Sequence, residues 1–137
     1  MADTPVDLNI IQGATFRKTL LWRQPPTPDQ EAAHLPGDPY DLDGCRATMQ
    51  IRTKVNGDIL LTLYDQDGLI LMPDDPTSGD PQEGVIVIEL DSQRTMSLEI
   101  TKPGSYDLFV IFPSGDVLRV VKGSVNVDLS VTDPVDA

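Results

Sequence analysis

The sequence predicts an all-β domain built as an antiparallel β-sandwich, with one short helix near residues 91–99. Two observations predict it. Short segments alternate apolar and polar residues with the period of two that is typical of strands with one buried face. Twelve prolines and ten glycines divide these segments, which favours many turns over long helices. Because 137 residues is the length of one ordinary domain, we expect residues 1–137 to form a single domain with one core.

Two strands are expected near the N-terminus. The first covers residues 6–11 and ends before Gly13. The second covers residues 15–23 and places three bulky apolar side chains on one face, Phe16, Leu20 and Trp22. Each segment keeps a polar face, as expected of a strand that covers the core on one side only.

Two loops rich in proline interrupt the strand pattern. Residues 24–39 hold five of the twelve prolines, and proline lacks the amide donor that a sheet needs. Residues 73–84 form a second loop, which is acidic as well as proline-rich. A connection as long as residues 24–39 is uncommon in a compact domain, so we expect this loop to pack against another subunit; an idle surface loop is the alternative.

The middle of the chain predicts a hairpin and a short strand. Residues 46–52 alternate cleanly, and Asn56-Gly57 is the dipeptide favoured in type I′ turns. The turn is expected to join that strand to a second one over residues 58–63. Residues 65–68 then form another turn, and a short strand follows over residues 69–72.

A buried strand and the helix come next. Residues 85–90 are almost continuously apolar, which predicts a central strand covered on both faces. The helix over residues 91–99 begins at Asp91 or Ser92, whose side chains cap helices well, and ends before Gly104.

The last third of the chain predicts three strands. Residues 106–112 and 117–121 pair around the reverse turn at residues 113–116. Gly123 marks a break or bulge, and a third strand covers residues 125–131. The total of eight or nine short strands is typical of an immunoglobulin-like sandwich, with a small barrel as the alternative. Residues 132–137 are expected to be a frayed tail.

The charge balance excludes several classes of partner. Ten basic residues against 22 acidic ones give a net charge of −12, whereas nucleic acids and anionic membranes attract an excess of Lys and Arg. No segment reaches the roughly 18 apolar residues of a membrane span. The single cysteine, Cys45, cannot form an intrachain disulfide, which fits assembly in a reducing compartment. We expect a soluble protein made in the cytoplasm, with no nucleic acid or membrane as its partner.

No pattern of residues predicts catalysis. The only histidine, His34, lies in a proline-rich loop, and Cys45 begins a strand, so a nucleophile with its base is not expected. Paired carboxylates such as Asp65 and Asp67 are explained by turns. The loop that starts at Asp65 has Pro76 where a calcium-binding loop needs a bidentate glutamate. Zinc and phosphate-binding motifs are lacking as well, so we predict a protein that is not an enzyme and uses no metal or cofactor.

Basic residues supply the first candidate contacts. Arg17 and Lys18 lie on one expected strand, and Arg46 and Arg52 lie on another. They can balance neighbouring acidic loops on a wet sheet face, or they can dock an acidic patch on a copy of the same protein.

Aromatic and apolar residues supply a second group of candidate contacts. Phe109 and Ile111 face away from the core if the alternate residues of their strand fill it, and an exposed apolar pair is a candidate partner surface. The alternative is cover by residues 24–39. Tyr40, just before the strand that carries Arg46, completes the candidate interface.

The order of motifs resembles that of small β-sandwich proteins of tailed bacteriophages. The resemblance extends over nearly the whole chain. Its motifs are Gly13 to Phe16 as G-x-T-F, Asp41 to Gly44 as DL-x-G, Ala47 to Arg52 as A-x-M-x-I-R, and Gly104 to Val127 as a hairpin ending in G-x-V-x-V. The proline-rich insertion at residues 24–39 departs from that pattern.

The resemblance implies a structural role in a virion. It is to stand-alone immunoglobulin-like modules that form tail collars or connect fibres to the tail, similar to the N-terminal domain of baseplate upper proteins. The implied partners are other virion proteins and copies of the protein itself, in a homo-oligomeric ring or another arrangement of multiple copies. A capsid decoration or head-to-tail completion protein is the alternative role, and a carbohydrate-binding module is the alternative of another class.

Overall fold

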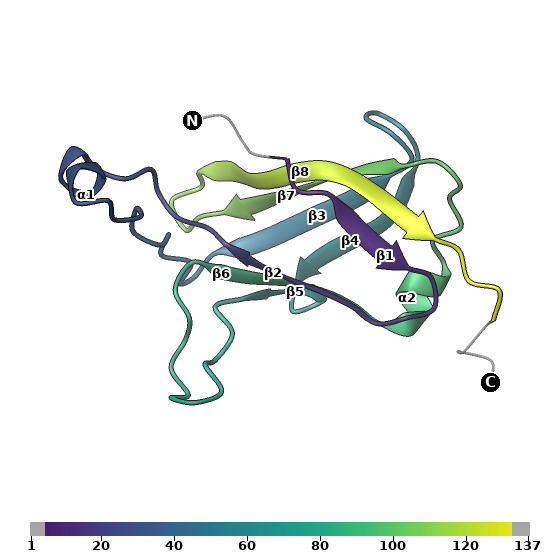
Figure 1. The fold of residues 1–137 in the computed structure, drawn as a ribbon, viewed down its shortest axis with the longest axis horizontal. Coiled ribbons are helices and arrows are strands. Elements are labelled where there is room, and N and C mark those ends of the chain that lie inside the picture. The colour runs from purple at the N-terminus through teal and green to yellow at the C-terminus, as the bar shows by residue number, and fades with distance from the viewer. Residues whose placement is uncertain (1–4, 133–137) are drawn as a thin grey trace.

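The computed structural model describes residues 5–132, which form one mixed β-sheet of eight strands that is nearly closed into a barrel (Figure 1). The strands are β1 (Leu8–Ile11), β2 (Phe16–Leu21), β3 (Arg46–Arg52), β4 (Ile59–Asp65), β5 (Gly68–Leu71), β6 (Val85–Leu90), β7 (Gly104–Ile111) and β8 (Val117–Asp128). Two short helices, α1 (Pro28–Ala32) and α2 (Ser92–Met96), lie in connections. The order across the sheet is β1-β8-β7-β3-β4-β5-β6-β2.

The prediction of a mostly β protein is confirmed, and α2 is the helix expected near residues 91–99. The expectation of purely antiparallel pairing is wrong, because β1 pairs with β8 and β4 with β5 in parallel. One hydrogen-bonded sheet runs through all the described strands. The two separate layers of an immunoglobulin-like sandwich are therefore not confirmed.

Alternation along the strands builds the core. β3 turns Ala47, Met49 and Ile51 inward, and β7 turns Leu108 and Val110 inward, and these side chains are buried. Burial of one large aliphatic side chain contributes about 1.5 to 3 kcal/mol to stability. The polar residues between them face the outside of the barrel, where they are available for contacts.

Strand β6 is buried on both faces, as its apolar run predicts. Ile86 and Ile88 are completely buried, and Val85 and Val87 are each 8% exposed. Its place in the sheet is not central, because only β2 lies beyond it. Burial on both faces thus occurs one strand away from the sheet edge.

Helix α2 is tied to the turn between β1 and β2. Asp91 caps it by accepting a hydrogen bond from the Arg94 amide at 2.8 Å. Buried Thr95 donates its hydroxyl to the Ala14 carbonyl at 2.8 Å. Gln12, also buried, donates its side-chain amide to the Met96 carbonyl at 3.0 Å. These bonds satisfy polar groups at one end of the barrel that would otherwise destabilise it.

Residues 24–39 contain a helix that the sequence interpretation missed, so α2 is not the only helix. Helix α1 begins after Thr27, whose hydroxyl accepts from the Gln30 amide while the Gln30 side chain accepts from the Thr27 amide. This capping box, with Pro28 in the first turn, is a recognised start signal. The density of prolines obscured it.

The hairpin between β3 and β4 forms, but not with the predicted type I′ turn. That turn needs a positive φ at both central residues. Here Asn56 has a φ of 63°, whereas the Gly57 amide donates to the Lys54 carbonyl at 2.8 Å and closes a longer loop. The Thr53 amide donates to the Asp58 carbonyl at 3.0 Å and closes the base of this loop.

The last two predicted strands are one strand, β8. Gly123 does not interrupt it; the register shifts opposite Leu108 and Phe109, where Val120 is the extra residue. The expectation that Leu129 and Val131 point inward is wrong, since both follow the end of β8 and are exposed. The predicted tail over residues 132–137 lies, beyond Thr132, outside the described residues.

Gly123 instead permits close contact with the N-terminal segment. A Cβ atom on Gly123 would lie 2.1 Å from the carbonyl oxygen of Val6. The Val6 amide donates to the Lys122 carbonyl at 2.9 Å, and β1 then runs parallel to β8. Among the helices within residues 5–132, none is long and apolar enough to cross a membrane.

Candidate protein-interaction site

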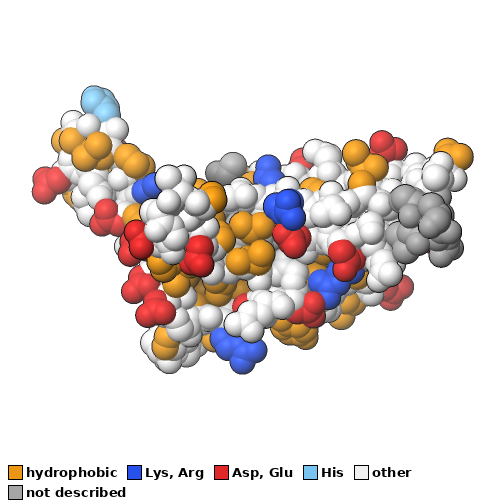
Figure 2. All heavy atoms as spheres, turned by 90° about the horizontal axis from the view of Figure 1, so that it is seen from below, with side chains coloured by type: hydrophobic (Ala, Val, Ile, Leu, Met, Phe, Trp, Pro, Cys, Tyr) orange, Lys and Arg blue, Asp and Glu red, His pale blue; other side chains and the backbone are white. Residues whose placement is uncertain are grey.

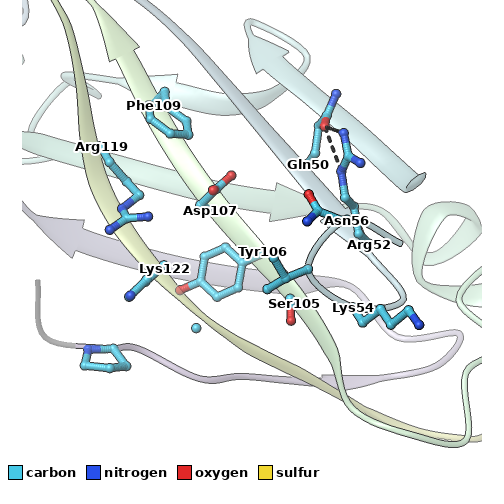
Figure 3. A pocket seen from close by; sticks show the side chains of 13 residues that line it. Gln50, Arg52, Lys54, Asn56, Ser105, Tyr106, Asp107, Phe109, Arg119 and Lys122 are labelled. Atoms are coloured by element: carbon cyan, nitrogen blue, oxygen red, sulfur yellow. Dashed lines mark hydrogen bonds between the residues drawn. The ribbon is translucent and has the colours of Figure 1, made fainter. Parts of the chain in front are cut away.

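A groove of about 690 Å³ lies on the outer face of β3, β7 and β8 (Figure 3). Its lining includes the side chains of Gln50, Arg52, Asp107, Phe109, Arg119 and Lys122. The turn between β3 and β4 contributes Lys54 to one side, and the start of the described chain contributes Pro5 to the other. We call this feature the basic groove.

Strand register explains why these residues meet. On β7 the odd-numbered residues face outward, opposite the buried Tyr106, Leu108 and Val110. Antiparallel pairing places Gln50 of β3 and Lys122 of β8 on either side of Asp107. Residues paired across strands share a face, so the side chains of three strands converge on one surface.

The charge of the basic groove is opposite to that of the protein as a whole. Four of the ten basic residues line it, Arg52, Lys54, Arg119 and Lys122, and Asp107 is the acidic side chain in its lining. Arg52 is held in place by Gln50, whose side-chain oxygen accepts from its Nη2 at 2.7 Å and its Nε at 3.2 Å. Local positive charge on an acidic protein attracts acidic groups of a partner.

Tyr106 also borders the basic groove, although its side chain is buried on the inner side of β7. Its hydroxyl donates to the Val6 carbonyl oxygen at 2.6 Å. Burial is the main cause that raises the pKa of Tyr106 to about 12, and the charge of the nearby Asp7 carboxylate is the second cause. The phenol therefore stays protonated near neutral pH, and its role is to join the N-terminal segment to β7.

The structure brings together some of the predicted contact residues. Arg52 and Phe109 line the basic groove. Ile111 lies on the same face of β7, half-buried, with Arg46 of β3 as its register partner. The Nε atom of Arg46 also lies 3.5 Å from Asp65, in an ion pair whose arginine is exposed and whose carboxylate is mostly buried. Since Phe109 lines the groove, residues 24–39 do not cover it.

The other predicted contact residues lie elsewhere. Arg17 and Lys18 are on β2, which is the last strand in the sheet order, whereas β8 is the second. Arg17 forms a 2.7 Å ion pair with Glu89. Tyr40 stacks on Trp22 with ring centroids 3.8 Å apart. Both rings pack against the core and near Phe112, so Tyr40 is a structural residue here.

Sequence reasoning missed the contribution of β8. Arg119 and Lys122 look like ordinary surface residues of a strand, and the extra residue Val120 changes which side chains share a face. Alternation was the available signal, because it predicts outward-facing residues on each strand. It could not show which strands are neighbours.

The single cysteine, Cys45, lies outside the basic groove. Burial is the main cause that raises the pKa of the Cys45 thiol, and the negative charges of Asp41 and Asp43 raise it further. Reactive cysteines, in contrast, have a lowered pKa. Its Sγ lies 3.8 Å from the Asp41 carbonyl oxygen. Within residues 5–132 there is no group of three or more His, Cys, Asp or Glu side chains placed to hold a metal ion.

Fold and site together define a mostly β protein with a basic, aromatic groove on an otherwise acidic surface. No family model matches this chain, and no curated protein matches it. Among solved structures, it is similar to the extracellular domains 3–5 of Drosophila OTK, with 16% sequence identity and a TM-score of 0.38. That alignment covers 96% of this chain and 35% of the other, so this chain spans about a third of the length of that structure.

Proposed function

We propose that this protein is a non-enzymatic structural module of a tailed-phage particle that works through protein–protein contacts in a symmetric assembly. A tail collar or a fibre connector is the role that the sequence motifs favour. In this proposal the protein is made in the host cytoplasm and resides in the virion. The proposal includes the finer fold assignment, an immunoglobulin-like arrangement of the strands.

The basic groove is the observation that carries the proposal. Aromatic residues and arginine are enriched at the centres of protein interfaces, where they supply most of the binding energy. Phe109 lies opposite Arg119 on β8 and shares with Arg52 and Lys122 a cleft formed by three strands. Strands hold side chains more rigidly than loops do, which reduces the entropy lost on binding.

The motif positions also support a phage module. The G-x-Y and P-S-G-x-V motifs belong to β7, the turn after it and β8, the hairpin that supplies most of the groove. The A-x-M-x-I-R motif is β3, which supplies the remaining wall. Two of the four segments that carry the resemblance thus help to build the candidate site.

The alternative functions have less support. A carbohydrate-binding module needs aromatic faces open to a sugar, but Trp22 and Tyr40 stack on each other. Tyr64 is 50% exposed, but it lies on β4, apart from that stack. A capsid decoration or head-to-tail completion protein would use the same fold with a different neighbour.

Mass spectrometry of purified particles tests the proposal. Particles of the phage or induced prophage that encodes the chain are banded by density, and the protein is expected at a fixed copy number per particle. Cryo-electron microscopy of the same particles then places it at the tail, the neck or the capsid. Absence of the protein from infectious particles would overturn the virion role.

A further inference from the structure

The basic groove lies along β7, whereas the acidic loop, residues 73–84, lies beyond the C-terminal end of that strand. The groove follows the strand from Ser105 to Phe109. Phe112, just after β7, packs near Trp22, with ring centroids 6.0 Å apart. The Trp22 amide donates to the Gly84 carbonyl at 2.7 Å, at the base of the acidic loop. In Figure 1 this loop extends from one end of the sheet, while the turn between β3 and β4 lies at the other.

The acidic loop is preorganised. Asp74 and Pro81 form an isolated β-bridge, and the Asp75 amide donates to the Asp80 carbonyl at 2.8 Å. One carboxylate oxygen of Asp75 accepts from the amides of Thr77 at 2.7 Å and Ser78 at 3.2 Å. A loop already fixed in one shape loses little entropy when it binds.

The charges on the acidic loop and in the basic groove are complementary. The loop exposes Asp74, Asp80 and Glu83 and has no basic residue. In the groove, the side chains of Arg52, Lys54 and Lys122 form no ion pair with any residue in the range 5–132. Figure 2 shows acidic side chains gathered at the end of the molecule that carries α1 and the acidic loop.

From this complementarity we infer that the acidic loop of one copy of the protein docks into the basic groove of the next copy. The inference rests on the proposed function, because it names the partner of the same groove. The acidic loop extends from one end of the sheet, and the groove opens on the outer face of β3, β7 and β8. In the proposed contact one copy uses its loop and the next copy uses its groove, so the contact is heterologous. Repetition of a heterologous contact gives a ring where the rotation closes and a filament where it does not.

Sedimentation velocity of the full chain over a range of concentrations tests the contact. At low salt we expect association that weakens as salt is added, since exposed ion pairs are screened. Lys122→Glu is expected to weaken the association at least tenfold. Lys18→Glu is the matched control, because it makes the same charge change on β2, and it should leave association unchanged. Equal effects of the two variants would overturn the inference.

A charge exchange identifies the occupant of the groove. Asp80→Lys alone should weaken association as Lys122→Glu does, and the double variant should restore it. Glu31→Lys places the same charge change in residues 24–39 and should have no effect. If Glu31→Lys weakens association while Asp80→Lys does not, the occupant is a different loop and the inference is wrong.

Disulfide trapping tests the head-to-tail geometry. In a Cys45→Ser background, Val55→Cys places a thiol on the rim of the groove and Ser78→Cys places one at the tip of the acidic loop. A mixture of the two chains should form crosslinked dimers, and each chain alone should not. Crosslinking of Ser78→Cys alone would show an isologous contact and overturn the inference. Thermal melts of every variant verify that it is folded.

The outcomes separate this inference from the proposed function. A protein that is present in particles but monomeric at every concentration and salt tested refutes the self-contact and leaves the structural role intact. A protein that associates through loop and groove but is absent from particles supports the self-contact and refutes the virion role.

Discussion

Trp22 and Tyr40 stack with ring centroids 3.8 Å apart and an interplanar angle of 19°. The two residues flank the proline-rich loop, residues 24–39, so the stacked rings join its two ends. The backbone adds to this closure, because the Tyr40 amide donates to the Trp22 carbonyl at 3.2 Å. A 16-residue insertion is thus anchored at its base without a disulfide.

Truncation of either ring should destabilise the protein. We expect Trp22→Ala to lower the free energy of unfolding by about 3 kcal/mol, at the lower end for a large aromatic because the ring is half-buried. Tyr40→Ala should cost less, since the ring is smaller. Urea denaturation of both variants and the double variant should give a coupling of about 0.5 to 1.5 kcal/mol. A coupling of zero would mean that the stack adds nothing to packing.

Adjacent residues of β7 should respond oppositely to the same change. Phe109→Asp is expected to leave the isolated fold largely intact and to weaken assembly, because Phe109 lines the outer groove. Leu108→Asp should unfold the protein, because it places a carboxylate at a position with 0% exposure. Thermal melts and sedimentation velocity distinguish these results. Severe unfolding of Phe109→Asp would place that ring in the core.

Two glycines should destabilise the protein for different reasons when replaced by alanine. Gly123→Ala is expected to cost about 1 to 3 kcal/mol, because its Cβ would lie 2.1 Å from the Val6 carbonyl oxygen and the pairing of the N-terminal segment with β8 must shift. Gly79→Ala measures backbone strain alone, because its φ is +76° and nothing lies within 4 Å of the added atom; we expect a cost of about 1 kcal/mol. Chemical denaturation should show a clearly larger loss for Gly123→Ala.

Stability should fall at alkaline pH through Tyr106. Its pKa is raised to about 12 in the folded protein from an ordinary value of 10.0, so between these values the folded state binds more protons than the unfolded state. The contribution of Tyr106 is therefore fully present below pH 10 and is lost as the pH rises towards 12. Urea denaturation between pH 8 and pH 11 should show a steeper decline for the native sequence than for Tyr106→Phe. Equal slopes would contradict this assignment.

Local patterns in the chain predicted much of the fold. Apolar patterns located the eight strands of the described residues, mostly through alternation and in β6 through a continuous apolar run. The ranges of β3 and β6 match the predicted residues 46–52 and 85–90, and Asp91 signalled the start of α2. These predictions succeeded because strand period and helix caps depend on neighbouring residues. The missed helix α1 had its capping box in the sequence as well, at Thr27 and Gln30.

The candidate site was predicted in part. Phe109 was expected to face away from the core, and Arg52 was expected on an outward face, since alternation within one strand settles both. The sequence could not predict that these two residues share a groove with Lys122. That arrangement depends on the pairing of β8 with β7 and on the register shift at Val120. Pairing is set by contacts between residues that are distant along the chain.

By itself, the sequence determined where the strands lie, which side of each strand is apolar, and that the net charge is strongly negative. Only the tertiary structure decided that β1 runs parallel beside β8, that the strands form one nearly closed sheet, and that four cations gather on one face of an acidic protein. The reason is physical. Alternation fixes the direction of a side chain relative to its own strand, whereas neighbours across a sheet are chosen by the packing of the whole core.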